Sequence, residues 1–209
     1  MIYIEELGDS ESSRKTLLGI VREVATQIFI PLTVGGGVKS LDDFEMLLAN
    51  GADKVSINSA AIAEPGLISA ASNKYGSSTV IVSVDYKKGS NGEYAVWMNG
   101  GKKKTALHPV NWAQECEKRG AGEILLSSID QDGTKKGLDL SLTKSVVDAV
   151  SIPVVTSGGC GLASDFVDGY IIGGASAVAA GTYFCFKDQG FMQVRAHIKN
   201  ANIPIRIGT

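Results

Sequence analysis

Short, continuous apolar runs recur along the chain. Between them lie longer stretches, in which apolar residues repeat every three to four positions. Apolar runs rich in Val and Ile are typical of strands that are buried on both faces of a parallel sheet. The pattern therefore predicts seven strands, at residues 2–5, 32–34, 54–57, 79–84, 123–127, 154–156 and 177–179.

The stretches between these runs have the spacing of amphipathic helices. One of them has Ser40 as its N-cap and Asp43 in its first turn. The spacing predicts helices at 16–27, 41–50, 67–74, 111–119, 142–150, 163–170 and 192–200. Strands that alternate with helices in this way are typical of a parallel α/β fold.

The segment 86–104 departs from this rhythm. It is rich in glycine and contains Tyr94-Ala95-Val96-Trp97, in which side chains of different character alternate. Alternation of this kind between glycine turns predicts an additional hairpin after the strand at 79–84.

Two parts of the chain, 31–60 and 153–182, repeat one pattern. Each reads as a strand, a glycine turn, a helix, a second strand and a turn of small residues. Glycine turns after buried strands expose backbone N–H groups, which together with a helix N-terminus form an anion site. Two copies predict two such sites, and therefore a substrate with a phosphate at each end.

The alternation of strands and helices, with this internal repeat, indicates a (β/α)₈ TIM barrel in a single domain over residues 1–209. Seven strands are one short of a closed barrel, whose typical length is about 250 residues. If the glycine-ended strands are the third and the seventh, the missing unit is the first strand with its helix. We therefore expect an N-terminally truncated barrel with two exposed strand edges, through which the chain could self-associate.

The composition excludes several classes of function. The chain has 209 residues, 44% of them hydrophobic, and a net charge of −2 with acidic and basic residues mixed along it. We therefore expect neither a nucleic acid nor a membrane as partner. Cys116, Cys160 and Cys185 lie far apart with no histidine nearby in sequence, which favours a reducing cytoplasm over disulfides or a metal site.

Asp85 is the first candidate for chemistry, because it follows directly after an apolar strand. Active sites of barrel enzymes lie at the C-terminal ends of the strands. Burial there raises the pKa of a carboxyl group toward the range of a general acid or base. The alternative interpretation is an aspartate that only caps a turn.

Small and hydroxyl-bearing residues at the other strand ends are candidates for phosphate binding, since they let backbone amides approach an anion. The first set is Gly37, Asn58 and Ser59. The second set is Gly133, Thr134, Gly158, Gly159, Ala180 and Gly181. Packing against neighbouring residues is the alternative, most seriously for Ala180.

Together these features resemble the cyclase subunit of imidazole glycerol phosphate synthase, the HisF family. The similarity covers almost the whole chain and is carried by the segments 32–37, 51–60, 82–85, 119–126, 128–134 and 157–159. The resemblance implies a two-half barrel without metal or organic cofactor. It also implies a reaction between ammonia, supplied by a glutaminase partner, and a bis-phosphorylated aminoimidazole carboxamide ribonucleotide (PRFAR). The products are imidazole glycerol phosphate and the purine precursor AICAR.

The resemblance also assigns roles to residues. Asp85 looks like one of two catalytic aspartates of the family, whereas the other belongs to the first strand, which has no counterpart here. The two sets of small residues look like its two phosphate sites. Asp53, Lys54 and Glu123 match charged positions on the lower face, where the glutaminase docks and ammonia enters. From the residues alone, Asp53 and Lys54 could equally form a structural ion pair.

Two other functions stay open at this point. The segment 179–189 is closer to HisF-like paralogues found with surface-polysaccharide genes, which are thought to pass ammonia to a sugar amidotransferase. The sister barrel isomerase of histidine synthesis has the same repeat and two phosphate sites. The 119–126 run and the hairpin after Asp85 argue against that isomerase, and turnover of PRFAR with ammonia would separate the cyclase from both.

Overall fold

The computed structural model describes residues 2–5, 11–185 and 190–205. All seven predicted strands are present and run parallel in one sheet, in the order β1-β2-β3-β4-β7-β8-β9. Their bounds are β1 Ile2–Glu5, β2 Leu32–Gly35, β3 Lys54–Ile57, β4 Val80–Lys88, β7 Glu123–Ser128, β8 Val154–Ser157 and β9 Ala177–Ala179.

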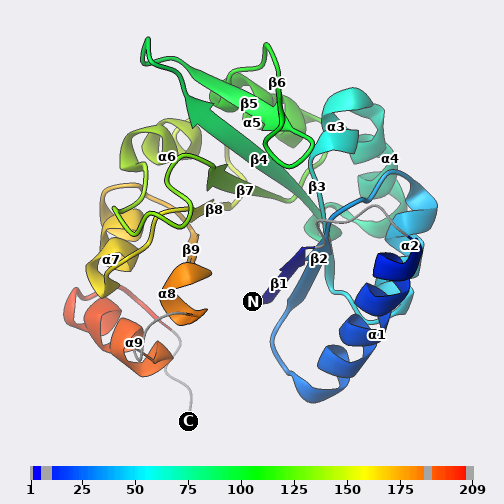
Figure 1. Cartoon of the computed structure of the whole chain (residues 1–209), viewed down its shortest axis with the longest axis horizontal. Coiled ribbons are helices and arrows are strands. Elements are labelled where there is room, and N and C mark those ends of the chain that lie inside the picture. The colour runs from blue at the N-terminus through cyan, green and yellow to red at the C-terminus, as the bar shows by residue number, and fades with distance from the viewer. Residues whose placement is uncertain (1, 6–10, 186–189, 206–209) are drawn as a thin grey trace.

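The sheet curls strongly, so that strands from its two ends face one interior (Figure 1). Ile81, Leu125 and Val155 form an interior cluster, against which Tyr3 of β1 and Ala179 of β9 pack. In addition, the Tyr3 hydroxyl donates a hydrogen bond of 2.8 Å to Glu123 of β7, although three strands separate β1 from β7 in the sheet. This is the curvature of a (β/α)₈ barrel that stays open between β1 and β9.

Helices follow most of the parallel strands. Their bounds are α1 Glu11–Gln27, α2 Leu41–Ala49, α3 Ser59–Ala63, α4 Gly66–Tyr75, α5 Pro109–Lys118, α6 Leu140–Val147, α7 Ala163–Ile171, α8 Thr182–Cys185 and α9 Phe191–Asn200. The prediction missed α3 and α8, which follow β3 and β9 and are too short to show helical periodicity. Within the described residues, no helix is long and apolar enough to cross a membrane.

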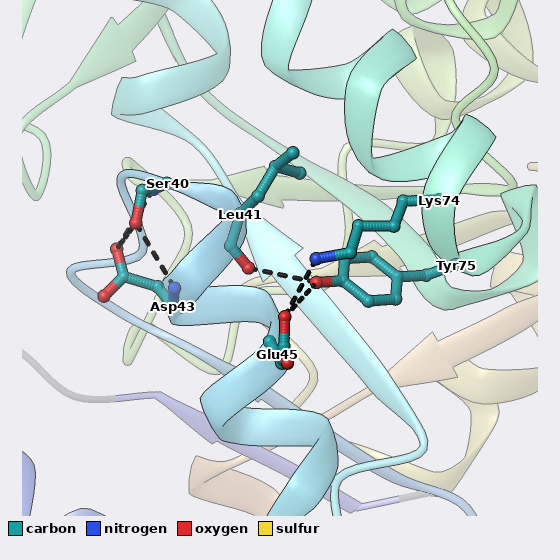
Figure 2. A network of polar contacts seen from close by, with 6 residues as sticks. All are labelled: Ser40, Leu41, Asp43, Glu45, Lys74 and Tyr75. Carbon is teal, nitrogen blue, oxygen red and sulfur yellow. Dashed lines mark hydrogen bonds and ion pairs between the residues drawn. The ribbon is translucent and has the colours of Figure 1, made fainter.

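The two repeated segments both contain a strand–helix–strand unit, β2–α2–β3 and β8–α7–β9. The first unit starts its helix as predicted: the Ser40 side chain accepts a hydrogen bond from the Asp43 amide, and the Asp43 carboxylate accepts one from the Ser40 amide. Figure 2 shows this cap beside the contact of α2 with α4, where the Tyr75 hydroxyl donates to the Leu41 carbonyl at 3.2 Å. That contact holds α4 against α2.

The predicted hairpin after β4 is confirmed. Strand β4 continues beyond the barrel and pairs antiparallel with β5 (Tyr94–Met98), which pairs with β6 (Lys103–Lys104). In Figure 1 this hairpin extends from one rim of the curled sheet. The core lies mainly between the sheet and its helices, and includes Val82, Val84 and Tyr86 on the outward side of β4.

Candidate active site

The C-terminal ends of the parallel strands place most of the predicted site residues on one face. Gly35 of β2 pairs with Ser56 of β3, so Gly37 and Asn58, each two residues further on, leave the sheet side by side. Asp85 of β4 pairs with Ser127 of β7, and Ser127 pairs with Ser157 of β8. The glycine turns and Asp85 therefore border the same opening of the barrel.

Asp85 lies on the interior face of β4, because side chains alternate along a strand and Ile81, four residues earlier, belongs to the interior cluster. The Ser83 hydroxyl donates a hydrogen bond of 2.8 Å to Asp85 Oδ1. Burial raises the pKa of the Asp85 carboxyl above its usual value, and interactions with Ser83 and Asn58 offset part of this rise. An interior carboxyl with a raised pKa suits proton transfer better than turn capping.

Asn58 and Ser59 begin the short helix α3 next to Asp85. The Asn58 Nδ2 atom is buried beside Asp85, although it makes no hydrogen bond of regular geometry to any described residue. The Ser59 hydroxyl accepts a hydrogen bond of 2.8 Å from the backbone amide of Asn99, in the turn between β5 and β6. The hairpin thus reaches the first predicted phosphate site.

Gly37 follows β2 in the left-handed region with a φ of 64°, and the preceding Gly36 has a φ of 94°. Such angles favour glycine. Both glycines line a shallow hollow between α1 and α2, which is bordered mainly by the apolar side chains Leu17, Leu18, Val38, Met46 and Leu47. The structure therefore places Gly37 on the same rim as Asn58. However, Asn58 does not line the hollow that contains Gly37.

Four residues of the second predicted site are gathered in one small pocket. The strand-end residues Gly158, Gly159, Ala180 and Gly181 line it together. The remaining lining residues are Asp132, Ser157, Cys160, Ala179 and Thr182. Glycine is required at two of these positions. A Cβ atom on Gly158 would lie 2.5 Å from the Ser128 carbonyl oxygen, and a Cβ atom on Gly159 would lie 2.1 Å from the Gly137 carbonyl oxygen.

Gly133 and Thr134 are not in the wall of this pocket. They lie in the loop after β7, where the Thr134 hydroxyl donates a 2.7 Å hydrogen bond to the Gln131 carbonyl. The same loop reaches the pocket at Asp132, and its Gly137 amide donates to the Gly159 carbonyl at 2.9 Å. Strand-end position alone therefore does not give the path of a long loop.

Five lining residues were missing from the predicted site, namely Asp132, Ser157, Cys160, Ala179 and Thr182. Ser157 and Thr182 have a signal in the sequence, because each is a hydroxyl residue next to a predicted glycine. Asp132 directly precedes Gly133 in the loop after β7, and its position against the glycine turn depends on the path of that loop. Residues 186–189 of the C-terminal segment singled out above lie outside the described residues.

The predicted charged residues of the lower face lie at the opposite end of the strands. Lys54 Nζ and Glu123 Oε2 form a 2.7 Å ion pair across the barrel interior, and Tyr3 donates to the other oxygen of Glu123. Asp53 takes a different role, since its Oδ2 accepts a hydrogen bond of 2.8 Å from the Leu32 amide. Lys54 thus pairs with Glu123, and Asp53 fixes the start of β2.

Replacing the buried Glu123 is expected to cost more stability than replacing an exposed partner. Glu123→Gln leaves the Lys54 ammonium without its counter-charge, for an expected loss of about 1–3 kcal/mol in the free energy of unfolding. The exposed pair Lys144–Asp148 is the control, and Asp148→Asn is expected to change the same quantity by less than about 0.5 kcal/mol. Urea titration of both variants measures the difference, and equal losses would contradict the structural role of Glu123.

Comparison with known proteins agrees with this arrangement. Residues 1–189 match the histidine biosynthesis protein family. The chain is 42% identical over 205 residues to the imidazole glycerol phosphate synthase subunit HisF of Alkaliphilus metalliredigens (strain QYMF). The aligned region covers 98% of this chain and 81% of that relative. By both comparisons, the chain belongs to the HisF family of histidine biosynthesis proteins.

Proposed function

We propose that the chain is the cyclase subunit of an imidazole glycerol phosphate synthase, which converts PRFAR and ammonia into imidazole glycerol phosphate and AICAR in histidine biosynthesis. The single observation that carries this proposal is the position of Asp85. It lies on the rim of an open barrel, at the end of a central strand, with glycine-bearing strand ends on both sides of it in the sheet. A substrate with a phosphate at each end can place its middle near this carboxyl.

Asp85 is the proposed general acid and base for ring closure and cleavage. A raised pKa keeps a larger share of the carboxyl protonated near neutral pH, so the same group can donate and accept protons in one cycle. The backbone amides at Gly37, with Asn58 and Ser59, are the proposed site of one phosphate. Those at Gly158, Gly159, Ala180 and Gly181 are the proposed site of the other, whereas Gly133 and Thr134 lie in the neighbouring loop without lining it.

A glutaminase subunit is the proposed partner, docking at the lower face where Lys54, Glu123 and Asp53 lie. The Lys54–Glu123 pair blocks part of the barrel interior at that end, so ammonia would pass beside it on its way to Asp85. The sheet edges at β1 and β9 are the proposed places where another strand pairs with this chain. We propose the cytoplasm as its compartment, since Cys116, Cys160 and Cys185 are all free thiols.

Binding of PRFAR tests the two-phosphate arrangement. Because both phosphate sites act on one molecule, PRFAR is expected to bind at least about a hundredfold more tightly than glycerol phosphate or ribose 5-phosphate alone. Calorimetric titration of the three ligands measures the ratio. Equal affinities would contradict a substrate held at both ends.

A further inference from the structure

The inner face of the hairpin continues the wall on which Asp85 lies. Directly opposed residues of an antiparallel pair have their side chains on the same face of the sheet. Asp85 of β4 is opposed by Trp97 of β5, and Trp97 is opposed by Lys104 of β6. These three side chains therefore share the face that looks toward the interior of the barrel.

Lys87 belongs to the same face, two residues beyond Asp85 along β4. Its Nζ atom lies 4.1 Å from the centre of the Trp97 ring, which is the geometry of a cation–π contact. The neighbouring Lys88 is on the opposite face, where its ammonium group lies 5.1 Å from the ring centre of Tyr94. Two adjacent lysines are thus held by two aromatic rings on opposite sides of one strand.

The β4–β5 end of the hairpin extends away from the rim, whereas its β5–β6 turn lies against the strand ends (Figure 1). Its turn is tied to the start of α3 by the hydrogen bond from the Asn99 amide to the Ser59 hydroxyl. At Gly101, a Cβ atom would lie 3.1 Å from the Ile129 side chain, which follows β7. In Figure 1 this turn lies beside α3. The inner face of the hairpin is therefore directed over the opening that Asp85 borders.

We propose that Lys87 and Lys104, on either side of Trp97, form a cationic wall that binds the anionic substrate above Asp85. The identity of that substrate rests on the proposed function. Neither ammonium group forms an ion pair with a carboxylate in the part of the chain that the structure describes, so both charges are available to a phosphate group. Trp97 acts as a positioning residue, because its ring fixes the direction of the Lys87 ammonium group.

The two faces of the hairpin supply matched controls. Lys87→Met and Lys104→Met remove a charge from the inner face, whereas Lys88→Met and Lys103→Met remove the same charge from the outer face. The inner-face variants are each expected to raise the KM for PRFAR about tenfold, with kcat changed less than twofold. The outer-face variants are expected to change KM less than twofold. Steady-state assays with ammonium salt at two ionic strengths measure these values.

Further variants separate a binding role from a structural one. Lys87→Arg keeps the charge and is expected to restore the KM, and Trp97→Phe is expected to raise KM less than Trp97→Leu does, because a phenyl ring still holds the ammonium group. The proposal is overturned if inner-face and outer-face variants shift KM equally while the unmodified chain remains active. If the unmodified chain does not convert PRFAR, the proposed function is wrong. Calorimetric titration of the same four variants with PRFAR then tests the cationic wall separately, because only the inner-face variants are expected to bind PRFAR more weakly.

Discussion

Replacing Asp85 with asparagine is expected to abolish most of the turnover of PRFAR while leaving its binding nearly intact. Asparagine has almost the same shape as aspartate but exchanges no proton at the pH of the reaction. Losing a general acid–base group costs about a hundredfold to ten-thousandfold in kcat. Asp85 is the acid–base candidate that the strand-end geometry supports best, so the loss is expected near the upper end of this range. Rate measurements with saturating ammonium salt, alongside PRFAR affinity, test the expectation.

Ser83→Ala is the matched control for this variant. It removes the hydrogen bond from Ser83 to Asp85 but keeps the carboxyl group. Since that bond lowers the Asp85 pKa, its loss is expected to move the acid limb of the pH–rate profile upward, with a change in kcat of less than about tenfold. An Asp85→Asn variant as active as Ser83→Ala would contradict the assignment of Asp85.

The raised pKa of Asp85 also predicts how stability depends on pH. The folded chain binds the Asp85 proton more tightly than the unfolded chain does. The contribution of Asp85 to the free energy of unfolding is therefore greatest below the unfolded pKa, and it is lost as the pH rises through the folded pKa. Asp85→Asn lacks this dependence. Its stability relative to the unmodified chain should consequently rise with pH across that interval.

Gly159→Ala is expected to damage both the fold and the second phosphate site. The φ of Gly159 is 103°, and an added Cβ atom would lie 2.1 Å from the Gly137 carbonyl oxygen. The backbone of two loops must then move apart, for an expected loss of more than about 3 kcal/mol in the free energy of unfolding. Because the pocket lies between these loops, the affinity for PRFAR is expected to fall by at least about tenfold in whatever fraction folds. Denaturant titration and calorimetry measure the two effects.

Gly133→Ala separates backbone strain from the clash. Gly133 also has a positive φ, of 73°, but an added Cβ atom there meets nothing within 4 Å. Its expected cost is therefore only the left-handed conformation, about 1–2 kcal/mol. Since Gly133 is outside the wall of the pocket, its effect on PRFAR affinity is expected to be small. Equal effects of the two alanine variants would contradict the packing of Gly159 against Gly137.

The strands could be predicted from the sequence because continuous apolar runs are the direct result of burial on two faces. Helices α3 and α8 could not, since neither is long enough to repeat its apolar face. The length of β4 was underestimated for another reason. Its residues beyond Val84 pair with β5, and the last two, Lys87 and Lys88, extend past the pairing with β7, where the pattern is no longer a continuous apolar run.

The candidate site divides in the same way. Asp85 and the glycines next to strands were predictable, because a strand end is a fixed point of the fold. Gly133 and Thr134 lie further along a loop, whose path depends on contacts such as the one between Gly137 and Gly159. The ring that holds Lys87 was equally hidden, since only the pairing of β4 with β5 brings Trp97 to it.

The most direct measurement is the conversion of PRFAR with ammonium salt, followed by quantifying both products. It is made on this chain as it is, and on the chain joined to the first strand–helix unit of a HisF protein, which would pair between β9 and β1. The account predicts equal amounts of imidazole glycerol phosphate and AICAR, formed most rapidly by the form with the added strand–helix unit and lost in Asp85→Asn. PRFAR that is bound but unchanged by both folded forms would contradict it, and would favour a HisF-like protein that only conducts ammonia.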